Sequence, residues 1–323
     1  MMETVVERFL AVAQANPNAL AVITDNGTWT YKALALRTRQ IADAIDQWFK
    51  NETGRSADVS DIIGISLDKN ADLLASMIAI MALGAAYVPI DPELNRNTQT
   101  YILDRCNCKL VVCKPDALRG IDTIGRIDPT AIEIDGKPKL IEPRAHLEDR
   151  CYTIFTSGST GHPSGVPILH RNLVNLCKWV TAEFGLGRTN RVLQFSTINF
   201  DASVLDIFPA LTSGAALCLP TGEQRLSENE LAWFCMHHHI DHAFLPPALL
   251  AVLNSERFPQ IRTVLTGGEA CSHTTLAAWA PTRRFFNLYG PTECTVVVSF
   301  KEISAEMPQK YRSCHSWSAF TCA

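Results

Sequence analysis

The sequence lacks an excess of positive charge. Of its 323 residues, 29 are Lys or Arg and 33 are Asp or Glu, which gives a formal net charge of −4. A protein that binds a nucleic-acid backbone needs a basic field, so nucleic acid is not an expected partner. The composition, 47% hydrophobic and 19% charged, also excludes the collagen-like, coiled-coil and intrinsically disordered classes.

The eleven cysteines lack the spacing of a zinc site or of a disulfide scaffold. They stand singly apart from Cys106 and Cys108, without a CxxC pair. Secreted disulfide scaffolds are usually short and rich in loops, so we expect buried, reduced thiols and a cytoplasmic protein.

Residues 237–239 and His242 are histidines, but only Asp241 accompanies them at ligand spacing. We expect a surface or helix-end cluster there rather than a metal site.

The sequence also lacks a signal peptide and a clear membrane span. Charged residues interrupt residues 1–21, which therefore do not have the architecture of a signal peptide. Residues 73–90 contain no charge, but Gly84 and Pro89 interrupt the run. We expect a buried helix over 71–83 and a buried strand over 86–90, and no membrane partner.

Predicted helices and strands alternate along most of the chain. This pattern is typical of an α/β fold with mainly parallel sheets, and the length suits about two lobes. We expect an N-terminal α/β subdomain with an irregular linker over 1–150, a ligand-binding α/β subdomain over 151–300 and an atypical tail over 301–323. Predicted strands of the second subdomain cover 152–155, 191–195, 215–219, 242–245, 263–266 and 285–288, with helices between them.

A loop rich in hydroxyl groups and glycine follows the predicted strand 152–155. Its backbone amides could approach a phosphate closely, and its hydroxyls would add donors. It is neither a P-loop nor a GxGxxG loop. On spacing alone, such a segment is more often a solvent-exposed turn than a nucleotide site. The loop consists of Thr156, Ser157, Gly158, Ser159, Thr160 and Gly161.

Four ordered motifs resemble the adenylate-forming (AMP-binding) superfamily, and in particular the amino-acid adenylation domains of nonribosomal peptide synthetases. Residues 156–165 (TSGSTGHPSG), with 170–173 (HRNL), resemble the phosphate loop of this superfamily. Residues 84–91 (GAAYVPID) resemble its early structural motif, 199–204 (NFDASV) its substrate-pocket motif and 287–293 (NLYGPTE) its nucleotide motif. The resemblance covers about residues 5–300 and implies two stacked βα subdomains of the large lobe of these enzymes.

The resemblance implies ATP and Mg²⁺ as cofactors and a small carboxylic or amino acid as substrate. The substrate carboxylate would attack the α-phosphorus of ATP, giving an acyl-adenylate and pyrophosphate, while the protein positions the two anions. The loop 156–161 would hold the β- and γ-phosphates. Thr292 would bond the α-phosphate, and Glu293 would ligate Mg²⁺. The remaining implied nucleotide contacts are Gly268, Glu269, Ala270, Asn287, Tyr289 and Gly290; a plain turn with a helix cap is the alternative for 290–293.

Asp201 bears on the substrate class. It could simply cap the helix that begins near Ser203. In peptide synthetases the matching carboxylate pairs with the α-ammonium group of an amino acid, and a carboxylate in apolar surroundings needs such a partner. The other implied pocket positions are Ala202, Leu205, Phe244, Leu265, Gly267, Leu288, Val296 and Val297. Because these are apolar or small, the resemblance implies a neutral hydrophobic amino acid.

Two departures from the family pattern keep other functions open. Ser164 stands where the phosphate loop normally has Lys, which removes a positive charge. Residues 301–323 resemble nothing in the family, and the chain reads as truncated before its C-terminal parts, without a carrier domain. A phosphopantetheine carrier would have to come from another domain or protein. The alternatives are a non-catalytic nucleotide-binding remnant or pseudoenzyme, and an acyl- or aryl-acid CoA ligase.

The sequence finally predicts where the ligands lie. In open α/β sheets, ligands bind beyond the carboxyl ends of the strands. Thr156, Asp201 and Tyr289 all fall at such ends. We therefore expect three loops, far apart in the chain, to converge on one triphosphate and one carboxylic acid.

Overall fold

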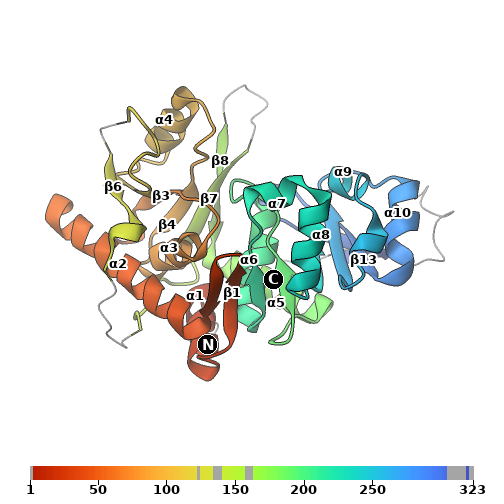
Figure 1. Cartoon of the computed structure of the whole chain (residues 1–323). Helices are drawn as coiled ribbons and strands as arrows, with labels where there is room; N and C mark the ends of the chain where they lie inside the picture. Colours follow the sequence, from red (N-terminus) through yellow and green to blue (C-terminus); the bar gives the residue numbers. More distant parts are fainter. Residues whose placement is uncertain (1–2, 122–123, 134–139, 157–162, 304–317, 320–323) are drawn as a thin grey trace. The chain divides into compact units, whose positions relative to one another are not determined.

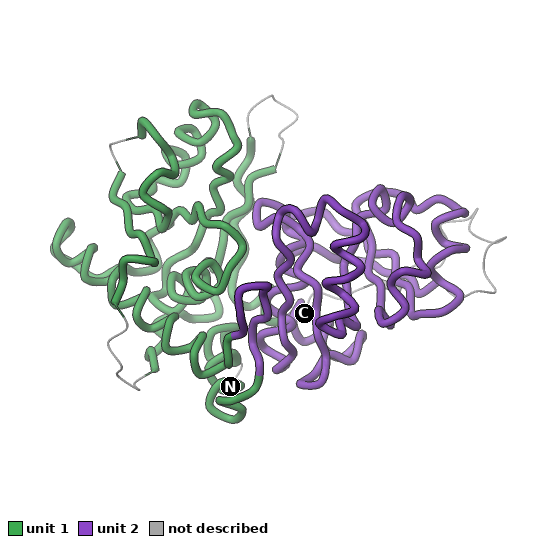
Figure 2. The backbone as a smooth tube through the Cα atoms, in the orientation of Figure 1, with its two compact units in different colours: residues 1–19, 29–174 green, residues 20–28, 175–323 purple. Residues whose placement is uncertain are grey.

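A computed structural model of the chain describes residues 3–121, 124–133, 140–156, 163–303 and 318–319. The chain divides into two compact units (Figure 2). The first unit comprises residues 1–19 and 29–174, and the second comprises residues 20–28 and 175–323. Residues 20–28 are an excursion into the second unit, and the chain passes to that unit again within helix α5 (His170–Phe184).

The first unit is built on a six-stranded sheet with the order β6-β5-β3-β4-β7-β8 (Figure 1). Neighbouring strands run parallel except for β7 and β8, which form an antiparallel hairpin. Every residue of β3, β4 and β5 is buried, as expected for parallel strands covered on both faces. The strands are β3 (Ile62–Ser66), β4 (Ala86–Pro89), β5 (Leu110–Cys113), β6 (Gly125–Ile127), β7 (Arg150–Thr156) and β8 (Ser164–Leu169).

The helices of the first unit start at well-formed caps. Thr4 and Glu7 make a capping box at the start of α1, and the Asn70 side chain accepts from the Leu73 amide at the start of α3. A partly buried ion pair joins α2 and α3, with 2.7 Å between Arg37 Nε and Asp72 Oδ1. The helices are α1 (Val5–Ala15), α2 (Tyr31–Thr53), α3 (Ala71–Ala82), α4 (Arg96–Arg105) and the short 3₁₀ turn η1 (Pro129–Ala131).

The second unit is built on a nine-stranded sheet with the order β15-β14-β13-β12-β11-β9-β10-β1-β2. The strands from β13 to β1 are parallel, and β14 and β15 add antiparallel edges. The strands are β1 (Leu20–Thr24), β2 (Gly27–Thr30), β9 (Arg191–Leu193), β10 (Ala216–Cys218), β11 (His242–Phe244), β12 (Thr263–Gly267), β13 (Arg284–Tyr289), β14 (Ser299–Ile303) and β15 (Ser318–Ala319).

Helices and 3₁₀ turns connect the strands of this sheet. They are α6 (Ala202–Ser213), α7 (Gly222–Leu226), α8 (Glu228–His237), α9 (Pro247–Leu250), α10 (His273–Trp279), η2 (Ser255–Arg257), η3 (Ala280–Thr282) and η4 (Thr292–Cys294). All but η4, which leads into the antiparallel strand β14, lie between parallel strands.

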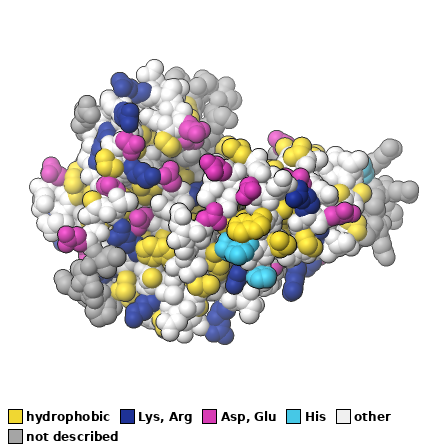
Figure 3. Space-filling view, in the orientation of Figure 1, with side chains coloured by type: hydrophobic (Ala, Val, Ile, Leu, Met, Phe, Trp, Pro, Cys, Tyr) yellow, Lys and Arg dark blue, Asp and Glu magenta, His cyan; other side chains and the backbone are white. Residues whose placement is uncertain are grey.

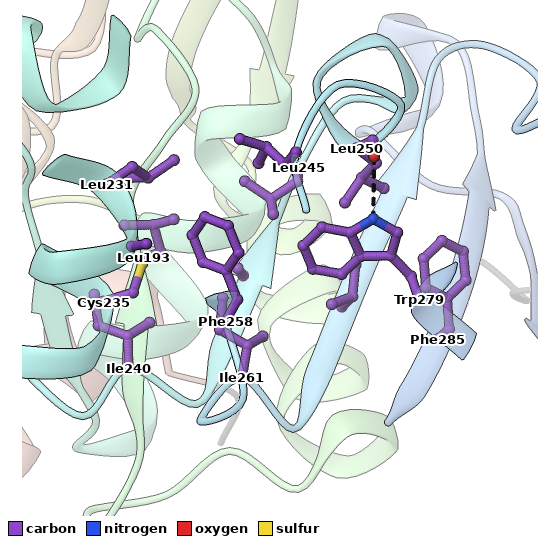
Figure 4. Close-up of a cluster of buried hydrophobic side chains, with 14 of the residues drawn as sticks. Leu193, Leu231, Cys235, Ile240, Leu245, Leu250, Phe258, Ile261, Trp279 and Phe285 are labelled. Carbon is purple, nitrogen blue, oxygen red and sulfur yellow. Dashed lines mark hydrogen bonds between the residues drawn. The ribbon is translucent and has the colours of Figure 1, made fainter. Parts of the chain in front are cut away.

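A large apolar core lies between the sheet and the helices of the second unit (Figure 4). Trp279 is fully buried there, and its indole nitrogen donates to the backbone oxygen of Leu250 at 3.0 Å. Its ring packs against Phe258, with 5.8 Å between the ring centroids. The hydrogen bond satisfies the one polar group of a large apolar side chain. This core fixes the strands whose carboxyl ends carry the candidate site.

The structure confirms the predicted α/β class with mainly parallel sheets, and it confirms the buried helix and strand within residues 71–90. The boundaries of the two units differ from the predicted subdomains 1–150 and 151–300. Residues 150–174 stay with the first unit because β7 pairs with β4 and β8. Residues 20–24 belong to the second unit because β1 pairs with β10.

Other expectations need correction. Residues 301–303, assigned to an atypical tail, pair with β13 as part of β14. Nine free cysteines lie in the described part of the chain; seven are buried as expected, whereas Cys271 is half-buried and Cys294 is exposed. Of the described helices, none is both long enough and apolar enough to cross a membrane.

One buried histidine should make stability depend on pH. His170 is fully buried in the first unit, and neither of its ring nitrogens has a hydrogen-bond partner within the described residues. Burial lowers the pKa of His170 to about 4, although Asp149 and Glu7 act in the opposite direction. The unfolded chain, with a pKa near 6.5, therefore binds a proton at this residue more readily than the folded chain does between pH 6.5 and 4.

We expect the stability contributed by neutral His170 to be complete above pH 6.5 and to fall as the pH drops toward 4. Because of this residue, the free energy of unfolding measured with urea should be about 2–3 kcal/mol lower at pH 4.5 than at pH 7.5. His170→Phe should lose this part of the pH dependence, and His239→Phe, at an exposed histidine, should retain it. Equal pH dependence of the wild type and His170→Phe would contradict the prediction.

Candidate active site

A cavity of about 380 Å³ opens at the carboxyl ends of the parallel strands of the second unit. Its wall comes from the ends of β9, β10, β11, β12 and β13 and the segments that follow them, where sheets of this class bind ligands. A cavity of this size and largely apolar lining is typical of a small-molecule site. The lining residues are Phe195, Ser196, Thr197, Phe200, Asp201, Ala202, Leu205, Arg225, Phe244, Pro246, Gly267, Gly268, Leu288, Gly290, Val296 and Val297.

Asp201 precedes α6 but does not cap it. Its side chain makes no capping hydrogen bond, because the amides of Ser203 and Val204 already donate to the backbone oxygens of Phe200 and Asp201, at 3.0 and 2.9 Å. The capping alternative for this carboxylate is therefore wrong. The side chain instead lines the cavity, with the Thr292 side chain beside it.

The electrostatics of Asp201 are those of a carboxylate that has lost part of its water. Burial raises the pKa of Asp201 above its ordinary value. The hydrogen bond from Thr292 and those from the backbone amides of residues 201 and 202 lower it, whereas the negative charge of Glu293 raises it further. A cation placed beside this carboxylate would oppose the effect of burial. The arrangement is suited to binding a positively charged group.

The turn after β13 presents Thr292 and Glu293. Gly290 lies so close to the returning chain that a Cβ there would collide with the backbone oxygen of Val296. Thr295 and Val296 have positive φ values of 63° and 73°, which are strained for β-branched residues. This compact turn holds Thr292 next to Asp201 and leaves the Glu293 carboxylate exposed.

The predicted nucleotide contacts of the second unit differ in their exposure to solvent. Tyr289, at the end of β13, is 62% exposed and presents its ring to solvent, whereas Asn287 is buried within the same strand. Gly268 has a φ of +85° and open space beside it. Glu269 and Ala270, which follow it, are exposed. Tyr289 and the 268–270 loop are therefore accessible to a ligand.

The predicted phosphate loop belongs to the first unit. Thr156 ends β7, and its hydroxyl lies 3.5 Å from the backbone oxygen of Ser164, where β8 begins. Ser157, Gly158, Ser159, Thr160 and Gly161 lie outside the described residues, as does His162. Their role in binding phosphate stays a prediction.

The structure brings most of the predicted pocket residues together. All of them except Leu265 line the cavity; Leu265 is buried in β12. That these residues contact a substrate stays a prediction. Six further lining residues were not predicted, namely Phe195, Ser196, Thr197, Phe200, Arg225 and Pro246. Phe195 ends a predicted strand, Ser196, Thr197 and Pro246 directly follow predicted strands, and that position could have identified them.

The histidine cluster lies apart from the cavity lining. His237 is exposed at the end of α8, and its ring stacks on Trp233 with 4.6 Å between the centroids. The buried His242 bonds Asp241 through Nδ1 and the Phe184 backbone oxygen through Nε2, at 2.9 and 3.1 Å. Figure 3 shows histidine side chains beside hydrophobic ones on the visible face. Among the described residues, no group of three or more His, Cys, Asp or Glu is arranged to hold a metal ion.

The fold and the cavity define an α/β protein with a small-molecule site at the carboxyl edge of a parallel sheet. The model of the AMP-binding enzyme family matches residues 9–317, and the chain belongs to this family.

Sequence relatives are peptide synthases. The chain is 34% identical to bacitracin synthase 3 of Bacillus licheniformis over 91% of its own length and 5% of that protein. It is 29% identical to tyrocidine synthase 1 of Brevibacillus parabrevis over 90% of its own length and 26% of that protein. The chain thus spans a small part of the curated relatives it matches.

Solved structures agree on the fold. An AMPPNP-bound form of the nonribosomal peptide synthetase FmoA3 matches 95% of this chain and 33% of its own, with a TM-score of 0.84 and 25% identity. The form bound to alpha-methyl-L-serine-AMP matches 94% of this chain and 34% of its own, with a TM-score of 0.83 and 26% identity. The N-terminal subdomain of Klebsiella oxytoca NpsA, at 23% identity, has a TM-score of 0.83 over 94% of this chain and 79% of its own.

Substitution of Gly290 should disturb the turn that holds Thr292. In Gly290→Ala the new Cβ would meet the Val296 backbone oxygen and lie 2.7 Å from the Val297 Cα. Because backbone cannot yield as a side chain does, we expect a loss of about 1–3 kcal/mol in the free energy of unfolding, measured with urea. Gly187→Ala is the matched control, since open space surrounds Gly187. Equal stability of the two variants would contradict the tight turn.

Proposed function

We propose that this chain activates an amino acid by adenylation. A carboxylate oxygen of the acid bonds to the α-phosphorus of ATP while the bond from that phosphorus to the bridging oxygen breaks, and pyrophosphate leaves. The observation that carries the proposal is the partly buried Asp201 carboxylate, beside Thr292, in the wall of an apolar cavity. Membership of the AMP-binding enzyme family and the likeness to peptide synthases support it.

Asp201 would hold the α-ammonium group of the substrate. An ammonium group beside the carboxylate forms a charge-assisted hydrogen bond and offsets part of the cost of burial. An acid without an amino group would leave Asp201 without this cation. This distinguishes an amino acid from the acyl- and aryl-acid substrates of the alternative CoA-ligase function.

The described residues fit a nucleotide with its metal ion. The exposed carboxylate of Glu293 is the hard oxygen donor that Mg²⁺ prefers, and the exposed Tyr289 ring offers a surface for a base. Bound Mg²⁺ would neutralise charge on phosphate oxygens. We assign Thr292 to the α-phosphate, Glu293 to the metal, and Asn287, Tyr289, Gly290 and residues 268–270 to the rest of the nucleotide. Residues 156–161 would bind the outer phosphates, as their resemblance to the family loop implies.

The cavity wall favours an apolar side chain. Leu205, Phe244, Leu288 and Val297 present apolar surface to it. Removing such a side chain from water is favourable by about 25 cal/mol per Å² of apolar area, so a neutral hydrophobic amino acid is the proposed substrate class. A carrier protein acting in trans would supply the phosphopantetheine thiol for a later transfer step.

One observation favours a second candidate function. Ser164, at the start of β8, replaces the lysine that the family loop normally carries, so a positive charge for the outer phosphates is missing. A chain with this loop could bind the nucleotide without catalysing the exchange of pyrophosphate. Exchange and binding measured on the same preparation separate the two functions.

Asp201→Asn should abolish amino-acid activation while stabilising the folded chain. We expect amino-acid-dependent ATP–pyrophosphate exchange to fall at least about 100-fold in kcat/KM, because the ammonium group loses its charged partner. The pKa of Asp201 is raised, so its charged form opposes folding at neutral pH, and Asn should raise Tm. Glu256→Gln, at an exposed carboxylate of η2, should change neither quantity. Undiminished exchange in Asp201→Asn would exclude the ammonium contact.

Glu293→Ala should lower Mg²⁺-dependent exchange by about 100- to 1000-fold, because phosphate charge is then poorly neutralised in the transition state. Since Glu293 is exposed, Tm should change little. Nucleotide binding, measured by calorimetry with and without Mg²⁺, should lose its metal dependence. A wild-type chain that binds ATP but exchanges no faster than Glu293→Ala would support the binding-only function instead.

A further inference from the structure

Arg225 introduces a positive charge into a cavity whose predicted substrate contacts are otherwise apolar, apart from Asp201. Among the described lining residues, Asp201 and Arg225 are the two that carry charge at neutral pH. Arg225 is partly buried and lies on the short helix α7. Sequence motifs did not indicate this residue, because α7 lies outside all of them.

Helix α7 is held in place at both the backbone and side-chain level. Thr221 and Gln224 form a capping box, in which the Thr221 amide donates to Gln224 Oε1 at 2.9 Å and the Gln224 amide donates to Thr221 Oγ1 at 3.2 Å. The Gln224 side chain also donates to Asp25 Oδ2 at 2.7 Å, in the turn between β1 and β2. The residue next to Gln224 is therefore presented to the cavity from a fixed support rather than from a loose loop.

The two charges reach the cavity from different segments of the chain. Asp201 follows β9 and lies beside Thr292, which follows β13. Arg225 follows β10, the strand next to β9 in the sheet. Phe244, at the end of β11, and Pro246 line the same cavity. A ligand that fills the cavity can therefore meet both charges.

We propose that Arg225 is a specificity-determining residue and selects a substrate whose side chain ends in an oxygen acceptor. The proposal rests on the proposed function. The substrate would be an α-amino acid with its ammonium group at Asp201, an apolar middle section against the cavity wall, and a terminal carbonyl or carboxylate oxygen at Arg225. A guanidinium group carries five N–H donors in a planar fork, which suits such an oxygen. The proposal changes the substrate class from purely hydrophobic amino acids to amino acids that combine an apolar middle section with this terminal group.

Matched acids of nearly equal size isolate this terminal contact. Norleucine and 2-aminoadipate both have three methylene groups in the side chain, which ends in a methyl group in the first and in a carboxylate in the second. The side-chain amide of 2-aminoadipate keeps the terminal oxygen but carries no charge there. Phenylalanine and 4-carboxyphenylalanine form an aromatic pair. For the wild type we expect the acids with a terminal oxygen to be preferred by about 10- to 100-fold over their methyl or unsubstituted partners, in exchange kcat/KM and in calorimetric affinity.

Variants then assign the preference to Arg225. Arg225→Leu should reduce the preference to below about threefold without changing KM for ATP. Arg225→Lys, which keeps the charge but not the fork, should retain a preference for the carboxylate and lose most of it for the amide. Arg262→Leu, at an exposed arginine before β12, is the charge-matched control and should behave as the wild type. Circular dichroism shows whether each variant is folded. If Arg225→Leu does not fold, the acid preference of Arg225→Lys tests the role of Arg225.

The outcomes separate this proposal from the proposed function. If no acid supports exchange while the wild type binds 2-aminoadipate more tightly than norleucine, adenylation fails and the specificity role stands. If exchange occurs but the wild type shows no preference, or Arg225→Leu keeps it, the specificity role is overturned and adenylation stands. A rise in KM for ATP in Arg225→Leu with unchanged acid preference would place Arg225 at phosphate and overturn the proposal.

Discussion

The chemistry of the candidate site depends on one carboxylate that is partly withdrawn from water. The groups that favour the charged form of Asp201 are the Thr292 hydroxyl and backbone amides, all of them neutral. Such donors stabilise a carboxylate less than a paired cation does, so burial prevails and the pKa is raised. The folded chain thus bears a local cost that binding of a cation can relieve. This makes Asp201 a selective contact, because a neutral ligand leaves the cost in place.

That carboxylate is positioned by backbone geometry at two separate places. The carbonyl oxygens of residues 200 and 201 accept from the amides of Ser203 and Val204, and the Asp201 side chain makes no capping hydrogen bond. The compact turn after β13 brings Thr292 to it, at the expense of positive φ angles at Thr295 and Val296. Strain of this kind persists only where the surrounding structure enforces it. Here the close approach of Gly290 to the returning chain enforces it.

The sequence predicts elements whose signal is local and misses those that depend on distant contacts. The uncharged run over 73–90 identifies the buried elements α3 and β4, and ordered motifs identify most of the cavity wall. The strand β8 was missed because Gly165 and Pro167 hide its alternation of exposed and buried residues. Arg225 was missed because the contact that holds α7 joins Gln224 to Asp25, 199 residues away.

The two charges of the cavity also explain why its apolar lining alone is a poor guide to the substrate. Apolar contacts discriminate weakly between side chains of similar size, since one methylene is worth only about 1–3 kcal/mol. A fixed donor or acceptor discriminates more strongly, because a mismatched ligand leaves a polar group poorly paired in a site that excludes water. With Asp201 and Arg225 both in the lining, selection acts on two polar contacts of a ligand. The apolar wall then sets mainly the length and thickness that the ligand can have.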